Sequence, residues 1–203
     1  AKWAKDHGKP IFLSEIGDMK LGWGDSDPGP KSFNAAISNS ESILRGMEVG
    51  VSAFNRWSFT NRGDLDGQWQ LIRTWSIEKK EYLKEVEIEP VAFYGYAIIT
   101  RFSVKHSSVV HTELIDAANI LSQTLKNPNG ELTTYIVNKG EVDQAIRLKI
   151  SGISYQKFYL YRVTEKEISK PEYHMNPIKE MIIQDGKEYI LTIPARSINT
   201  ITQ

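Results

Sequence analysis

The sequence contains no cysteine, which excludes disulfide bonds, thiolate metal sites and a cysteine nucleophile. It has no excess of either charge: 25 basic residues balance 25 acidic ones, so neither nucleic acid nor an anionic membrane is indicated as a partner. No apolar run approaches the roughly 18–20 residues that span a bilayer. The four histidines lack the spacing of metal ligands, and we expect neither a metal nor a cofactor.

The most informative segment is an apolar run that ends on a carboxylate, Lys9-Pro10-Ile11-Phe12-Leu13-Ser14-Glu15-Ile16-Gly17. A continuous run of this kind is typical of a strand buried on both faces of a parallel sheet. Glu15 comes at its C-terminal end, where eight-stranded α/β barrels carry their catalytic groups. Because a buried carboxylate is costly, Glu15 is either functional or paired with an arginine at the rim of the sheet.

The next segments predict a βαβ unit. Residues 33–50 have the apolar periodicity of a helix that Gly50 ends, and residues 51–59 read as a second strand. The helical crossover favours parallel pairing of the two strands. Residues 60–70 then form a polar loop, and residues 89–102 a further helix.

Alternation along the second strand separates its side chains into two sets. Asn55 and Trp57 fall on one face, which fits the interior of a barrel that opens into a pocket, whereas Arg56 faces the helices and is structural. Trp3 and Trp75 are expected to pack in the helix layer.

The pattern of predicted secondary structure changes near Ser103. Beyond it, short β-prone runs alternate with turn signals such as Asn138-Lys139-Gly140, a pattern typical of an antiparallel β-sandwich. The runs are Ser108–Thr112, Ile120–Leu125, Leu132–Val137, Ala145–Ile150, Lys157–Val163, Met181–Ile183, Tyr189–Ile193 and Ile198–Ile201. We therefore predict two domains: residues 1–103, an α/β domain containing the last two βα units of a (β/α)8 TIM barrel, and residues 104–203, a β-sandwich.

Two βα units do not close a barrel. Two parallel strands alone would leave open edges and an apolar face, which favours aggregation. We expect an upstream barrel segment of the same protein to supply the earlier strands, and residues 1–203 alone to be aggregated or partly unfolded. The alternative is a small independent α/β domain.

These segments together resemble the C-terminal half of a retaining glycoside hydrolase of the (β/α)8 superfamily called clan A. Residues 9–17 look like the seventh barrel strand, which in the clan ends in the nucleophilic Glu, and Val51 to Ser58 looks like the eighth, whose Trp floors the sugar site. Residues 94–110 resemble the last barrel helix running into an appended sandwich, and residues 193–201 its final strand. The resemblance is to family 30, with families 39 and 5 as alternatives.

The resemblance implies specific roles. Retaining hydrolysis needs a nucleophile and an acid/base about 5–5.5 Å apart, and Glu15 matches the nucleophile. The clan's acid/base Glu ends the fourth strand, which is not among these residues, so we expect the chain alone to be inactive. The loop acids Asp18, Asp25 and Asp27 are weak substitutes. The residues expected to bind the carbohydrate substrate are Trp57, Asn55, Asn61, Trp23 and Trp69. The resemblance also implies an extracellular or periplasmic location in a bacterium.

Two other functions stay open. The first is a non-catalytic carbohydrate-binding protein on the same scaffold, distinguished by the absence of an upstream Asn-Glu at a strand end. The second is a sugar-binding sandwich, although its aromatic residues alternate in a way that favours a core. Those residues are Tyr135, Tyr155, Phe158, Tyr159, Tyr161 and Tyr173.

Overall fold

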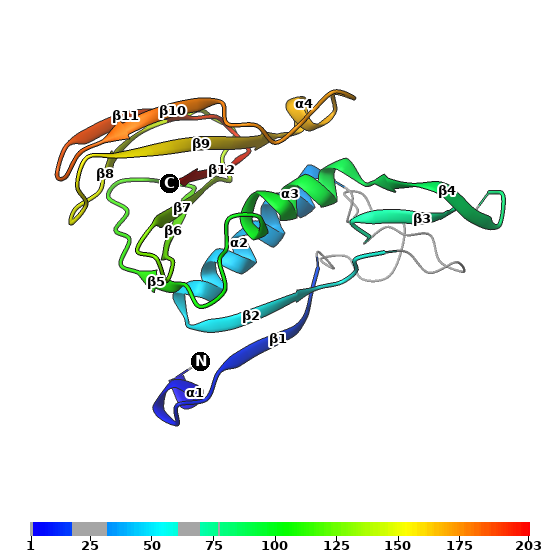
Figure 1. Ribbon diagram of the computed structural model, residues 1–203, viewed down its shortest axis with the longest axis horizontal. Helices are drawn as coiled ribbons and strands as arrows, with labels where there is room; N and C mark the ends of the chain where they lie inside the picture. Colours follow the sequence, from blue (N-terminus) through cyan, green and yellow to red (C-terminus); the bar gives the residue numbers. More distant parts are fainter. Residues whose placement is uncertain (1, 18–31, 61–69, 77) are drawn as a thin grey trace. The chain divides into compact units, whose positions relative to one another are not determined.

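The computed structural model describes residues 2–17, 32–60, 70–76 and 78–203 (Figure 1). The chain divides into two compact units, Ala1–Tyr96 and Ala97–Gln203. Several residues singled out in the sequence lie outside the described residues, namely Trp23, Asn61, Trp69, Asp18, Asp25 and Asp27.

The first unit contains the βαβ arrangement expected from the sequence. Its elements are β1 (Ile11–Ile16), α2 (Phe33–Glu48) and β2 (Val51–Arg56), and β1 pairs with β2 in parallel, which confirms that prediction. Helix α2 begins where the Ser32 hydroxyl accepts a hydrogen bond from the Ala35 N–H at 3.2 Å. It ends at Glu48, and Gly50, two residues further on, has a φ of 88° that favours glycine.

Helix α2 packs on β2 and on α3 (Pro90–Thr100) through two glycines that allow close approach. A Cβ placed on Gly46 would lie 2.5 Å from Cε1 of Phe54, so the Phe54 ring faces α2. A Cβ on Gly95 would lie 2.6 Å from the Cβ of Ala36. The buried side of α2 follows the helical period. Its apolar members are Phe33, Ala35, Ala36, Ile37, Ile43, Leu44 and Met47.

Strand β1 is not buried on both faces in this chain, contrary to the prediction. Phe12 is 64% exposed and Leu13 36%. The reason is that β1 pairs only with β2 among the described residues, so its other edge has no neighbouring strand there.

A hairpin that the sequence analysis missed follows the first βαβ unit. Strands β3 (Ile72–Ser76) and β4 (Glu81–Ile88) pair antiparallel, with a register irregularity between Arg73 and Trp75. The base of the hairpin is fixed by Glu89, whose carboxylate accepts hydrogen bonds from Gln70 at 3.1 Å and from Arg73 at 2.7 Å.

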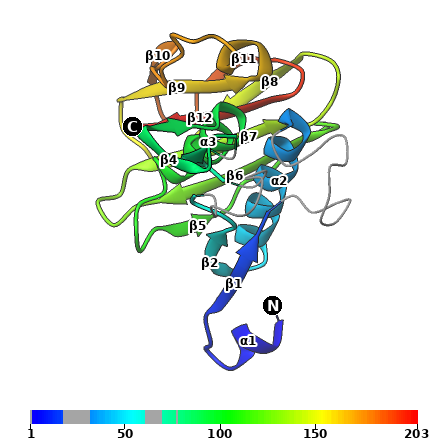
Figure 2. The same ribbon diagram turned by 90° about the vertical axis from the view of Figure 1, so that its right-hand side faces the viewer.

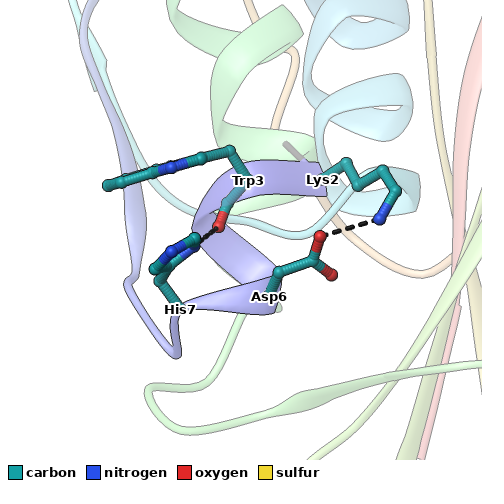
Figure 3. Close-up of polar contacts among 4 residues, drawn as sticks. All are labelled: Lys2, Trp3, Asp6 and His7. Atoms are coloured by element: carbon teal, nitrogen blue, oxygen red, sulfur yellow. Dashed lines mark hydrogen bonds and ion pairs between the residues drawn. The ribbon is translucent and has the colours of Figure 1, made fainter.

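Trp3, which was expected to pack in the helix layer, is largely exposed instead, so the prediction is wrong for this residue. Trp3 belongs to the short helix α1 (Lys2–Asp6), which precedes β1 (Figure 2). It is 68% exposed and stacks on His7 at 4.5 Å between ring centroids, beside a Lys2–Asp6 ion pair of 2.7 Å (Figure 3). Trp75 lies on β3.

The second unit contains two antiparallel sheets. One has the order β10-β9-β12-β7-β6-β5 and the other pairs β11 with β8 (Figure 2). Their bounds are β5 (Ser108–Val110), β6 (Ile120–Lys126), β7 (Leu132–Asn138), β8 (Gln144–Lys149), β9 (Gln156–Thr164), β10 (Lys179–Ile183), β11 (Glu188–Ile193) and β12 (Ser197–Thr202), with the single turn α4 (Glu165–Ile168). Leu191 and Ile193 of β11 share one core with Ile120, Phe158 and Ile201 of the larger sheet.

The aromatic residues of the second unit mostly fill this unit rather than forming an open platform. Tyr135 and Phe158 are fully buried, Tyr159, Tyr161 and Tyr173 are half-buried, and Tyr155 is exposed. The Tyr135 hydroxyl donates to the Ile99 carbonyl at 3.1 Å and bonds the Ser103 hydroxyl at 2.8 Å. These contacts favour a structural role for the set.

Candidate functional site

Glu15 and Asn55 lie at the same end of the parallel β1–β2 pair. In the strand register Leu13 is opposite Phe54 and Ile16 is opposite Arg56. Between these pairs β1 has two residues, Ser14 and Glu15, whereas β2 has only Asn55. The register of β1 therefore shifts by one residue at its C-terminal end, as it does in a β-bulge, a feature that redirects side chains next to functional sites.

This register shift decides which way Glu15 points. Leu13 and Ile16 are both in register with residues of the Phe54 face, which is turned toward α2. Alternation forward from Leu13 places Ser14 on the opposite face, and alternation back from Ile16 places Glu15 there as well, together with Asn55. Strict alternation from Leu13 would have put Glu15 on the helix side.

Trp57 completes this end of the sheet. Its backbone N–H donates to the Ile16 carbonyl at 2.8 Å, and the Trp57–Ser58 peptide bond is cis. By alternation Trp57 follows Asn55 on the face away from α2, and its side chain is 41% exposed. The structure thus brings together three of the residues predicted to form the site.

Arg56 lies on the other face, as the alternation predicted. Burial raises the pKa of the Tyr96 hydroxyl, and the nearby positive charge of Arg56 partly opposes that rise. Tyr96 belongs to α3, so the Arg56 guanidinium is directed toward the helices and away from the Glu15 face.

The Glu15 carboxylate is exposed, and among the described residues no hydrogen bond or ion pair engages it. The arginine partner that would give it a purely structural role at the rim is therefore not found in that part of the chain. An accessible carboxylate beside an indole ring and a carboxamide has the chemistry needed to attack an electrophile while a sugar ring lies on the indole.

No cluster of three or more acidic or histidine side chains that could hold a metal occurs among the described residues. Their helices are also too short or too polar to cross a bilayer.

Sequence reasoning missed one further aromatic pair. Trp75 of β3 and Tyr82 of β4 meet edge to face, with ring centroids 4.9 Å apart and planes at 86°. The turn between the two strands contains Lys80 at a φ of 55°, a conformation that turns usually give to Gly or Asn, so the sequence carried no turn signal here.

Comparison with solved structures identifies the fold. The chain superposes on a family 30 subfamily 8 xylanase from Clostridium acetobutylicum with a TM-score of 0.70 at 15% identity, covering 100% of this chain and 44% of the xylanase. A conserved exported protein from Bacteroides fragilis gives 0.65 at 18% identity (99% and 40% coverage), and a family 44 xyloglucanase from Paenibacillus polymyxa gives 0.62 at 13% (96% and 32%).

The chain therefore has the α/β fold, with many strands, of the part of these enzymes on which it superposes. It spans less than half the length of these neighbours.

Sequence comparison adds little to this assignment. No protein-family model matches the chain. Human myomesin-2 is 25% identical over 158 residues, which cover 74% of this chain and 11% of myomesin-2. The chain thus spans about a tenth of that relative, and the identity is too low to assign a family.

Proposed function

We propose that these residues are the C-terminal part of a retaining glycoside hydrolase that cleaves β-glycosidic bonds in a polysaccharide or oligosaccharide. In this proposal residues 1–103 contribute the last two βα units of a TIM barrel and residues 104–203 form an appended β-sandwich. The observation that carries the proposal is the register shift in β1, which directs Glu15 to the face of Asn55 at the C-terminal end of parallel strands.

Glu15 is the nucleophile in this proposal. Its carboxylate attacks the anomeric carbon, the bond to the leaving-group oxygen breaks, and a covalent glycosyl-enzyme forms that water later hydrolyses. Trp57 offers its ring face to the C–H face of the sugar in the adjoining position, and the Asn55 carboxamide can donate to or accept from a sugar hydroxyl. Asn61, Trp23 and Trp69 remain proposed as further substrate-binding residues.

The acid/base group is assigned to a segment outside residues 1–203. Two observations support this: Phe12 on β1 is largely exposed, as expected for a strand that lacks further barrel neighbours, and the family 30 xylanase is more than twice as long as the chain. Without that segment only half of the carboxyl pair is present, so residues 1–203 alone are expected to be inactive.

The substrate class and location follow from the neighbours by analogy alone. Xylanases, a xyloglucanase and an exported protein share the fold, so a β-linked plant or microbial polysaccharide outside the cytoplasm is proposed. A non-catalytic carbohydrate-binding protein is the alternative function, favoured if the preceding segment carries no carboxylate at a strand end.

A mechanism-based fluoroglycoside tests the proposal, because it traps the glycosyl-enzyme on its nucleophile. The intact natural protein is incubated with xylosyl and glucosyl versions, and the labelled peptide is mapped by mass spectrometry. The label is expected on Glu15. A label on another carboxylate removes the assignment of Glu15, and binding of polysaccharide without any label or turnover favours the alternative function.

A further inference from the structure

The β3–β4 hairpin extends from the same end of the sheet as the proposed nucleophile. The residues that follow Trp57 hold its base: the Ser58 and Phe59 carbonyls accept hydrogen bonds from the Leu71 N–H at 3.0 and 3.1 Å, and the Phe59 carbonyl also accepts from the Ile72 N–H at 3.0 Å. Thr60 forms a parallel bridge with Ile72, and its hydroxyl bonds the Thr74 hydroxyl at 2.8 Å.

The hairpin is held in place before any ligand arrives. The Glu89 carboxylate, whose side chain is 15% exposed, pairs with Arg73 at 2.7 Å, and the Glu89 N–H donates to the Leu71 carbonyl at 2.9 Å. Because the hairpin is already ordered, binding does not carry the entropic cost of ordering it, and this favours affinity. Trp75 lies three residues beyond Ile72, about 10 Å along the strand.

The aromatic pair near the tip of this arm presents an open ring. Tyr82 is 76% exposed although it contacts Trp75. Because the contact is edge to face, it covers at most one face of the tyrosine ring, and among the described residues no hydrogen bond engages the hydroxyl. The contact with the half-buried Trp75 limits the rotamers of Tyr82. Less side-chain entropy is then lost when a ligand binds, as is usual for rigid aromatic residues at binding sites.

We propose that the Tyr82–Trp75 pair is a second carbohydrate-binding subsite, which takes a neutral sugar ring of the polysaccharide against the open face of Tyr82. The inference rests on the proposed function, since it extends the same substrate along the hairpin away from Glu15. Tyr82 supplies the stacking surface, and Trp75 acts as a positioning residue that holds the tyrosine ring.

The test measures polysaccharide binding by affinity electrophoresis in gels that contain soluble xylan, xyloglucan or a soluble β-glucan. The intact natural protein carries Glu15→Gln so that binding is separated from turnover, and Tyr82→Ala, Tyr82→Phe and the control Val86→Ala are compared in that background. Val86 is 62% exposed on the same strand. Tyr82→Ala is expected to weaken binding about tenfold, while Tyr82→Phe and Val86→Ala stay within about twofold of the parent.

Loss of binding in Tyr82→Ala with retention in Tyr82→Phe identifies the ring as the contact and excludes general damage to the hairpin. Equal binding by Tyr82→Ala and its parent on every polysaccharide that is bound overturns the subsite. Equal weakening by Val86→Ala also overturns it. Hydrolysis of the polysaccharide by the wild-type protein is measured separately. If the protein hydrolyses the polysaccharide but Tyr82→Ala does not weaken binding, the subsite is refuted and the proposed function stands. If Tyr82→Ala weakens binding but there is neither hydrolysis nor labelling of Glu15, the proposed hydrolase function is refuted and the subsite stands.

Discussion

Replacing Tyr135 by phenylalanine should reverse the order of stability between wild type and variant as the pH rises. The Tyr135 side chain is fully buried, and its hydroxyl bonds Ser103 and the Ile99 carbonyl. Removal of this hydroxyl costs about 1 kcal/mol at pH 8, where the phenol is protonated in both folded and unfolded chains. The Ser103 hydroxyl still donates to Ile99 in the variant, which keeps the cost near that value.

The reversal comes from the pKa of Tyr135, which burial raises to about 12, although its hydrogen bond with Ser103 acts in the opposite direction. In the unfolded chain the phenol ionises near pH 10, so between pH 10 and 12 the unfolded state loses a proton that the folded state keeps. The contribution of the raised pKa to the free energy of unfolding is therefore fully present below pH 10 and is lost as the pH rises from 10 to 12. One pH unit above 10 removes about 1.4 kcal/mol, so the wild-type advantage should vanish near pH 11.

Urea denaturation of the intact natural protein and of its Tyr135→Phe variant at pH 8, 10 and 11 measures this difference in the free energy of unfolding. Tyr155→Phe is the matched control, because Tyr155 is 66% exposed, and it should alter stability by less than about 0.5 kcal/mol at each pH. A constant difference between wild type and Tyr135→Phe from pH 8 to 11 would refute the reasoning.

Two further substitutions test the packing of each unit. Gly95→Ala places a methyl group 2.6 Å from the Cβ of Ala36 and should destabilise the protein by about 1–3 kcal/mol. The measurement is the urea midpoint, which should fall. An unchanged midpoint would contradict the close contact of α2 and α3. Asn138→Ala removes a fully buried carboxamide that donates to the Val142, Ile193 and Pro194 carbonyls, and it should cost about 2–4 kcal/mol. A loss below about 0.5 kcal/mol would show that water replaces those bonds.

The sequence located the strands of the second unit closely because two local signals agree there. Tyr189–Ile193, for example, was read from alternating apolar residues bounded by the Asp185-Gly186 turn, and the structure has β11 at Glu188–Ile193. Gly186 adopts a φ of 68°, the conformation that such a turn requires. Alternation and turn chemistry were sufficient, since each strand is half covered by one core.

The sequence analysis missed the hairpin because contacts between residues far apart in the sequence hold it in place. Strand β4 carries charged residues at Glu81, Lys84, Glu85 and Glu87, which hide the alternation of a strand. What fixes the hairpin is the Glu89 carboxylate bonding Arg73, sixteen residues earlier in the sequence. No local pattern reveals such an ion pair.

The candidate site was only partly accessible to sequence reasoning. The pattern placed Glu15 at the end of a strand and Asn55 and Trp57 on one face of the next strand. The direction of Glu15 depends on the register shift between Leu13 and Ile16, which is set by pairing with β2. The sequence analysis also did not predict that β1 is exposed. A run of apolar residues predicts that a strand is buried but does not tell which segment of the chain packs on it.

The rate of polysaccharide hydrolysis by Glu15→Gln in the intact natural protein is the measurement that tests the central claim most directly. The amide keeps the size of the side chain but cannot form the glycosyl ester, so turnover should fall by about 10⁴-fold or more. Glu48→Gln, which removes an exposed carboxylate at the end of α2, should leave the rate within about twofold. Turnover by Glu15→Gln at the wild-type rate would contradict the account.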